Sequence, residues 1–313
     1  AEAASVTIDM TRLDVVLSDL SLPSLGLEHA TWNRLSDQVD LILHCGAWVH
    51  HRYSFTTLRA SNVDSTEQLI QLALSGAKRS RFCFVSTEAV ARSLANQPSA
   101  LEAVSNASSH PPQDDNGYVL SKWVGEQLVC QACQSLGLDA LIARPGNITG
   151  DTATAYSNYR SNHFWLFVKA CLQLQAVPQL PNDLEMMPVD TLSSAIVALS
   201  LQDREGLMVA NLGNTVQISW PDLLTVISTE LSLPITVVEP QHWQSLLAAA
   251  PETNALFPLR DLYQGDLMVI EPPVERHRSR SELARLGLSY DADPHSLARF
   301  YARYLQQQGF WTT

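Results

Sequence analysis

The sequence predicts an α/β protein built on a doubly wound parallel sheet, with a smaller and mostly helical C-terminal subdomain. Two observations carry this prediction. Short apolar segments alternate with segments of helical periodicity up to residue 145, which is the order that parallel sheets require. Small or polar residues follow four of the apolar segments, and ligands bind at the carboxyl ends of strands in such sheets.

Each predicted strand is an apolar run that ends where the sequence changes to small or polar residues. We expect buried strands at residues 13–17, 39–44, 82–87, 138–143 and 207–212. Helical periodicity between these runs predicts helices over residues 28–37, 56–75 and 117–135, and a further helix after Pro188. From Trp220 onward the pattern is mostly helical, which is typical of a lid over a binding crevice.

These elements divide the chain into two regions. Residues 1–145 are expected to form a Rossmann-like dinucleotide-binding core, and residues 146–313 mostly a substrate-binding subdomain. Residues 188–213 should return to the core sheet, because they contain a strand of the same apolar type. Four aromatic residues of the second region either line a substrate channel or simply pack: Trp220, Trp243, Phe257 and Tyr263.

The composition is that of an ordinary globular protein, and the charge argues against nucleic acid as a partner. The 313 residues are 46% hydrophobic and 17% charged, with a net charge of -12, whereas phosphate binding needs basic patches. No apolar run reaches the roughly 20 residues of a membrane helix, and the first residues do not resemble a signal peptide. Cys130 and Cys133 have no second CxxC pair to complete a zinc site. We therefore expect no metal, and free core thiols in a reducing, cytoplasmic compartment.

A tyrosine and a lysine one helical turn apart are the candidate catalytic pair. Tyr118 and Lys122 lie four residues apart in a predicted helix, so both side chains share one face. A phenol with a pKa of about 10 is a poor proton donor or acceptor near neutrality, and a nearby ammonium should lower that pKa. The bare YxxxK pattern also occurs by chance on solvated helices. The four strand ends that meet at one crevice favour the functional interpretation.

These residues give the chain a resemblance to the extended short-chain dehydrogenase/reductases. It is most similar to the thioester-reductase domains that end nonribosomal peptide and polyketide assembly lines. The resemblance spans roughly residues 13–245 and rests on an ordered set of short motifs: Asp19-Leu20, His44-Cys45-Gly46-Ala47, Asn62-Val63, Val85-Ser86-Thr87, Tyr118-Val119-Leu120-Ser121-Lys122-Trp123, Arg144-Pro145-Gly146 and Pro188-Val189-Asp190.

The resemblance implies a role for each of these segments. Thr87 and Tyr118 would hold the carbonyl oxygen of a thioester or aldehyde, Tyr118 would donate the proton, and Lys122 would hold the nicotinamide ribose and lower the Tyr118 pKa. Other residues would contact NADPH: Asp19, Leu20, Gly46, Ala47, Asn62, Ser86, Arg144, Pro145 and Gly146. The partner would be an acyl or peptidyl phosphopantetheine on an upstream carrier protein, and the chain a monomeric domain of a multidomain synthetase.

The sequence departs from this family at its start. Family members begin with a strand, a Gly-rich turn and a helix that cradle the cofactor pyrophosphate, whereas none of the 13 glycines here forms GxGxxG or GxxGxxG. Either an N-terminal segment is missing from the chain, or dinucleotide binding has been lost. We favour the first, because loss of a central strand would expose the sheet on both sides of the gap. We expect the chain by itself to bind NADPH weakly.

Three functions remain open at this point. The first is NADPH-dependent reductive release of a carrier-bound thioester as an aldehyde, which a second hydride would convert to an alcohol. The second is a redox-independent release or cyclisation domain on the same scaffold, and the third is a non-catalytic carrier-binding module. The intact Tyr118–Lys122 pair favours the first.

Overall fold

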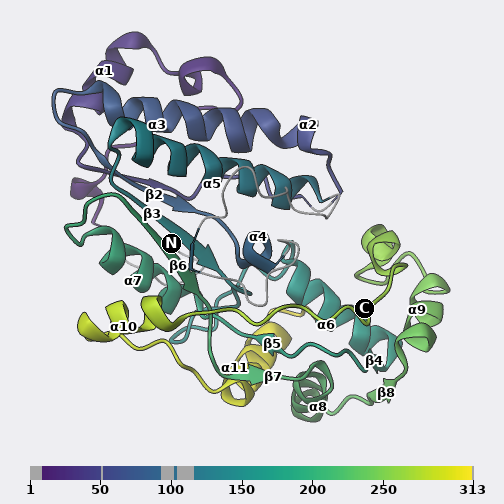
Figure 1. Ribbon diagram of the computed structural model, residues 1–313. Coiled ribbons are helices and arrows are strands. Elements are labelled where there is room, and N and C mark those ends of the chain that lie inside the picture. Colours follow the sequence, from purple (N-terminus) through teal and green to yellow (C-terminus); the bar gives the residue numbers. More distant parts are fainter. Residues whose placement is uncertain (1–8, 51, 93–101, 104–115, 312–313) are drawn as a thin grey trace.

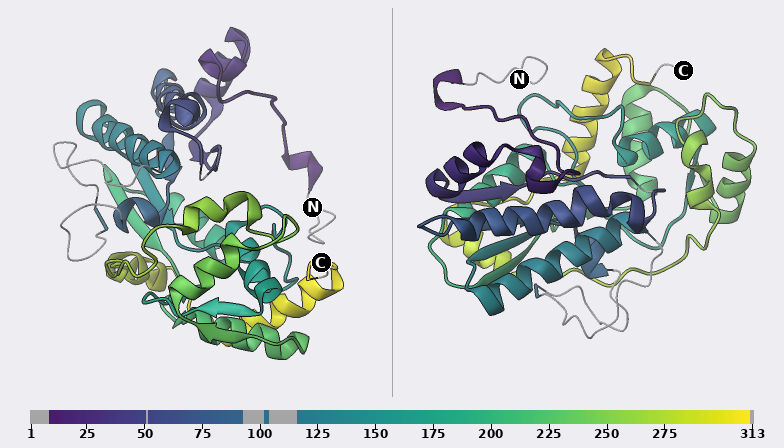
Figure 2. Two further views of the ribbon diagram at one scale, coloured as in Figure 1. Left: turned by 90° about the vertical axis from the view of Figure 1, so that its right-hand side faces the viewer. Right: turned by 90° about the horizontal axis from the view of Figure 1, so that it is seen from above.

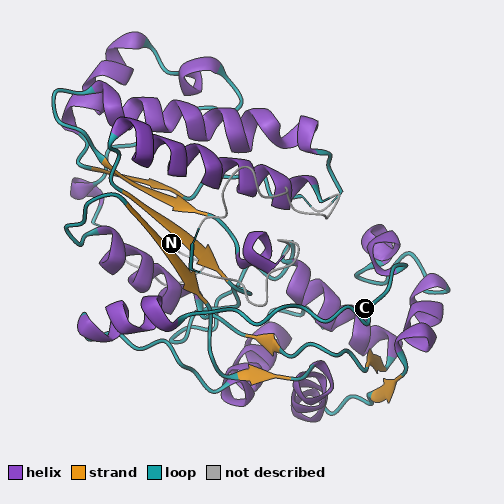
Figure 3. Cartoon of the chain, viewed as in Figure 1, coloured by secondary structure: helices purple, strands orange, loops and turns teal. Residues whose placement is uncertain are grey.

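The computed structural model describes residues 9–50, 52–92, 102–103 and 116–311. Its centre is a four-stranded parallel sheet in the order β1-β2-β3-β6 (Figures 1 and 3). The four strands are β1 (Leu41–His44), β2 (Arg81–Val85), β3 (Ala140–Pro145) and β6 (Leu207–Leu212). The doubly wound α/β fold predicted from the sequence is confirmed.

Alternating side chains of the sheet fill two cores, one on each face. Phe82, Phe84 and Ile142 point to the face that is covered by three helices on one side of the sheet: α1 (His29–Gln38), α3 (Ser65–Ser75) and α5 (Gly117–Leu136). Cys83 and Leu141 point to the opposite face, under α7 (Val189–Ser200) and α10 (His277–Arg285). Burial on both faces explains why these strands read as continuous apolar runs.

Short elements connect the core helices and strands. They are the 3-10 turns η2 (Met10–Arg12) and η3 (Pro23–Gly26), the helices α2 (Phe55–Arg59) and α4 (Glu88–Arg92), and the π-helical turn η4 (Ala60–Asp64). The turn η4 joins α2 to α3, so the predicted helix over residues 56–75 is one continuous helical segment with a wide turn inside it.

A second, mostly helical layer lies beside the carboxyl ends of the strands (Figure 2). It contains helices α6 (His163–Leu174), α8 (Trp220–Leu231), α9 (Pro240–Ala248) and α11 (Pro294–Gln307) and the 3-10 helix η5 (Phe257–Tyr263). Two small sheets complete it: β4 (Ala176–Pro178) pairs with β8 (Thr236–Val238), and β5 (Leu184–Glu185) with β7 (Gln217–Ile218). Its own aromatic core surrounds Trp165 and Trp243.

One predicted strand is wrong. Residues 13–17 form no strand, and their apolar side chains are exposed: Leu13 by 51%, Val15 by 73% and Leu17 by 89%. Among the described residues the sheet ends at β1, and residues 13–17 do not pair with that edge. Exposed Leu43 on β1 marks the same open edge. Within the described ranges, every helix is too short or too polar to cross a lipid bilayer.

Candidate active site

The largest described cavity, about 750 Å³, opens at the carboxyl ends of β2 and β3. One wall comes from the sheet and α5 and contains Ala47, Ser86, Thr87, Tyr118, Lys122, Pro145 and Gly146. The opposite wall comes from the helical layer and includes Phe164, Phe167, Trp220 and Tyr263. The cavity thus has a polar side on the Rossmann-like core and an aromatic side on the second layer, which suits a ligand that is held between them.

Local capping and close packing position Tyr118. The side chain of Asn116 accepts hydrogen bonds from the backbone N–H of Tyr118 and Val119, at 3.0 and 3.4 Å, which starts helix α5. Gly117 packs against the backbone of residues 53–55, where a Cβ would overlap with the carbonyl oxygen of Tyr53. Only glycine permits this approach. The start of α5, and with it Tyr118, is therefore fixed against the segment that leads into α2.

Lys122 is buried at the floor of the cavity and is held by the end of β2. Its Nζ donates to the backbone oxygen of Val85 at 2.8 Å and lies 4.8 Å from the centroid of the Phe84 ring. Burial lowers the pKa of Lys122 to about 8. An ammonium has three donors, so two remain for other acceptors in the cavity.

The expectation that Lys122 lowers the pKa of Tyr118 is wrong. Burial raises the pKa of Tyr118 to about 12, because removing a phenolate from water costs more than removing a phenol. The Tyr118 hydroxyl therefore keeps its proton near neutrality, which suits a proton donor better than a base.

Ser86, the residue before Thr87, provides an observation that bears on whether the nicotinamide end of a dinucleotide fits in this cavity. Ser86 is buried, lines the cavity, and its Oγ has no hydrogen-bond partner among the described residues. A buried polar atom without a partner is costly, and a bound ribose or carboxamide would remove that cost. Ser86, Thr87, Tyr118 and Lys122 thus fit the nicotinamide half. In contrast, the described residues contain no Gly-rich strand-turn-helix for the pyrophosphate.

Four other predicted cofactor residues lie outside the cavity lining. Asn62, on the π-helical turn, accepts from the backbone N–H of Trp48 at 2.7 Å and donates to Ser121 Oγ at 3.0 Å, so it holds the loop after β1 against α5. Leu20 packs against Gly46. Asp19 accepts from the backbone and hydroxyl of Ser21 and is exposed. Their contacts with a cofactor stay predictions.

Arg144, also predicted to contact the cofactor, is engaged in the protein core. Its Nε and Nη2 donate to the two carboxylate oxygens of Glu126 on α5, at 2.8 and 2.5 Å. Both side chains are 1% exposed. From this segment only Pro145 and Gly146 line the cavity.

Comparison with known proteins assigns the chain to a family. The NAD-binding family described as Male sterility protein matches residues 2–196. The chain belongs to this family. It is a terminal reductase domain of the nonribosomal peptide and polyketide synthetase type, within the extended short-chain dehydrogenase/reductases. The resemblance inferred from the motifs is confirmed, as is an NAD(P)-dependent type of reductase.

Individual relatives agree with this assignment. The chain is 32% identical over 82% of its length to the L-2-aminoadipate reductase large subunit of Eremothecium gossypii, and spans 19% of that protein. The terminal R domain from the myxalamid PKS-NRPS pathway is 28% identical with a TM-score of 0.88, covering 99% of this chain and 79% of that one. A thiolation-reductase di-domain from an archaeal non-ribosomal peptide synthetase shares the fold, at 20% identity and a TM-score of 0.73, over 91% of this chain and 61% of that one.

The reductase domain also contains lining residues that sequence reasoning missed. Asn158, Ser161, Asn162 and His163 border the cavity, and His163 Nε2 lies 2.8 Å from the hydroxyl of Tyr263. Asn162 caps helix α6, a signal that the sequence does contain. That signal gives the start of the helix but not the direction it faces. Trp220 and Tyr263 line the cavity, whereas Trp243 is fully buried in the aromatic core.

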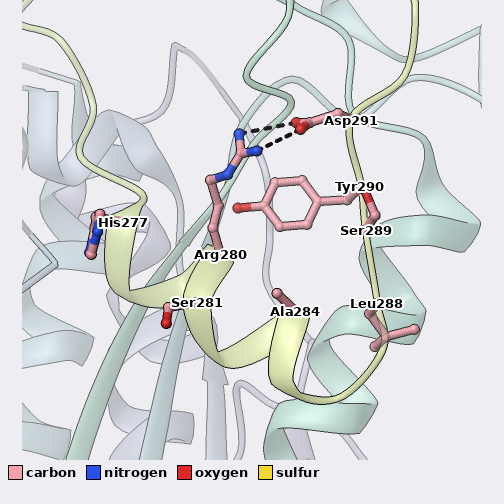
Figure 4. Close-up of a pocket in the computed structure, with 8 residues that line it drawn as sticks. All are labelled: His277, Arg280, Ser281, Ala284, Leu288, Ser289, Tyr290 and Asp291. Atoms are coloured by element: carbon pink, nitrogen blue, oxygen red, sulfur yellow. Dashed lines mark hydrogen bonds and ion pairs between the residues drawn. The ribbon is translucent and has the colours of Figure 1, made fainter.

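A separate hollow of about 350 Å³ lies between α10 and residues 288–291 (Figure 4). Arg280 and Asp291 form an ion pair at 2.7 Å across its rim, and the ring of Tyr290 stands beside them. The hollow shares no lining residue with the reductase cavity. Arg280 and Asp291 are thus already paired with each other, and a change to Tyr290 would lie away from the reductase cavity.

Proposed function

We propose that this reductase domain releases a carrier-bound acyl or peptidyl thioester as an aldehyde, with NADPH as the reductant. The observation that carries the proposal is the convergence of Thr87, Tyr118 and Lys122 on one cavity, opposite an aromatic wall. We further propose that residues 1–145 mainly bind the cofactor and that residues 146–313, apart from 188–213, mainly bind substrate. The relatives include synthetase proteins and a thiolation-reductase di-domain, which supports a phosphopantetheine arm as the substrate carrier.

The proposed chemistry uses side chains of the chain at defined points. When bound, the cofactor supplies a hydride to the carbonyl carbon of the thioester. Thr87 and Tyr118 donate hydrogen bonds to the carbonyl oxygen, where negative charge develops. Tyr118 then gives its proton to that oxygen. Collapse of the resulting hemithioacetal breaks the carbon–sulfur bond, leaving an aldehyde and the free thiol of the arm. A second hydride and proton would convert the aldehyde to an alcohol.

The proposal is tested with an acyl-pantetheine thioester and NADPH in large excess. We expect one aldehyde and one free thiol for each NADPH oxidised, or one alcohol for two. Release of the acyl group without NADPH oxidation would instead favour a redox-independent release domain. Binding of a carrier protein with no turnover would favour a carrier-binding module.

The pKa of Lys122 sets a pH limit on this activity. Burial lowers that pKa to about 8, so the fraction of ammonium falls as the pH rises through 8. If the ammonium holds the cofactor, kcat/KM for NADPH should fall above pH 8, approaching about tenfold for each further pH unit. Tyr118, with a pKa of about 12, does not titrate in this range. Initial rates between pH 6.5 and 9.5 measure the effect, and a flat profile to pH 9.5 would contradict the role given to Lys122.

A further inference from the structure

A side chamber of about 320 Å³ adjoins the reductase cavity. Thr87, Gly146 and Trp220 line both spaces. The chamber has apolar walls from Leu180, Leu267 and Trp220, and a charged end with Glu88, Arg92, Glu185 and Glu271. Nothing in the proposed reduction uses this charged end.

Two arginines join the charged residues into one network. Arg276 donates to Glu88 at 2.7–3.1 Å and also to Oε2 of Glu185. Arg92 pairs with Glu271 and lies 3.5 Å from Glu88. The network contains three carboxyl groups, of Glu88, Glu185 and Glu271, but only two guanidinium groups. It therefore has one acid more than its cations can neutralise.

Glu185 is the acid whose pairing is incomplete. Its side chain is 1% exposed, and its Oε1 accepts no hydrogen bond from the described residues. The guanidinium atom that pairs with that oxygen is Nη2 of Arg92, at a distance of 3.9 Å. Oε1 packs directly against Gly146, where a Cβ would overlap with it. Since Gly146 lines both spaces, this oxygen lies where the chamber meets the reductase cavity.

Burial and the neighbouring Glu88 raise the pKa of Glu185 to about 9. A buried carboxyl without a full counter-charge keeps its proton rather than ionise. A cation that entered the chamber would reverse this balance, because it would pair with the ionised form. An anion would meet excess acid and arginines that already have carboxylate partners.

We infer that the chamber binds an ammonium group carried by the acyl chain of the substrate, with Glu185 as its counter-ion. The inference rests on the proposed thioester reduction. The apolar part of the acyl chain would lie along Trp220 and Leu180, and the ammonium would reach Oε1 of Glu185. Glu185 would lose its proton to solvent as the ammonium binds. The chamber thus selects amine-bearing acyl chains over neutral ones of equal length.

Two isosteric probes test this selection: ε-aminocaproyl-pantetheine and heptanoyl-pantetheine. Titration calorimetry at pH 7 should show that the protein binds the amine at least about tenfold more tightly, as expected of a charge-assisted contact. Titration in two buffers of different ionisation enthalpy should show release of close to one proton with the amine only. Glu185→Gln should abolish both the preference and the proton release. Glu282→Gln, which removes an exposed carboxylate, should change neither.

The outcomes separate this inference from the proposed function, because binding does not require hydride transfer. Equal affinity for the two probes, or a preference that survives in Glu185→Gln, would overturn the ammonium site even if both thioesters are reduced. Selective, Glu185-dependent binding of an amine thioester that is never reduced would support the site and count against thioester reduction. Failure of the protein to bind either probe would overturn both.

Discussion

Replacing Tyr118 by phenylalanine is expected to lower kcat for thioester reduction by about 10²–10⁴-fold. The change removes one hydroxyl from the cavity wall and leaves the ring in place. Without that hydroxyl, the developing oxyanion loses a hydrogen bond and its proton donor, and Thr87 alone remains to stabilise it. Single-turnover measurement of aldehyde formation, with NADPH in excess, isolates the chemical step from product release.

Tyr290 provides a matched control for this variant. It is buried, at 5% exposure, and lines the separate hollow beside Arg280. Its hydroxyl has no hydrogen-bond partner among the described residues. Tyr290→Phe makes the same chemical change away from the reductase cavity and should leave the rate unaltered. A Tyr118→Phe protein that forms aldehyde at a near-normal rate would refute the role of Tyr118, and a matching loss in Tyr290→Phe would indicate a general effect on folding.

Much of the fold could be predicted because buried strands appear in the sequence as runs of apolar residues. The strands β2 and β6 lie between two helical layers, so most of their residues are apolar, and the predicted positions agree closely with the observed ones. Residues 13–17 form a similar apolar run but do not form a strand. A strand needs hydrogen-bonding neighbours, and an apolar run does not reveal whether a neighbour is present.

The candidate site was predictable only where its residues follow a local pattern. Thr87, Tyr118 and Lys122 come from strand-end and helix-spacing rules, and they do line one cavity. The direction of the Tyr118 pKa shift could not be predicted, because it depends on burial by residues from distant elements. The charged network around Glu185 could not be predicted from the sequence for a related reason. Arg276 lies 188 residues from Glu88 and 91 from Glu185, so no sequence motif connects them.

Arg144 illustrates how one local pattern permits two different roles. Its position at the end of a strand predicted contact with the cofactor, whereas the structure pairs it with buried Glu126. The two roles have different consequences when Glu126 is changed. If Arg144 serves the core, loss of its partner should lower the free energy of unfolding. If it serves the cofactor, the loss should appear mainly in NADPH affinity.

We expect Glu126→Gln to destabilise the fold by about 3–5 kcal/mol, because it removes the carboxylate that pairs with a buried guanidinium. Urea unfolding followed by circular dichroism measures this change. An m-value equal to that of the unchanged protein would show that unfolding is still two-state. Glu282→Gln breaks an exposed pair with Arg285 and should cost no more than about 1 kcal/mol.

The double variant Glu126→Leu with Arg144→Met separates the loss of a pair from the loss of a charge. Replacing both members of a buried ion pair by apolar residues of similar size is often neutral, since neither charge then has to be removed from water. The double variant should therefore recover most of the stability that Glu126→Gln loses. It should also keep its affinity for NADPH if Arg144 does not touch the cofactor. If the double variant recovers its stability but loses much of its affinity for NADPH, the result would show that Arg144 does contact the cofactor.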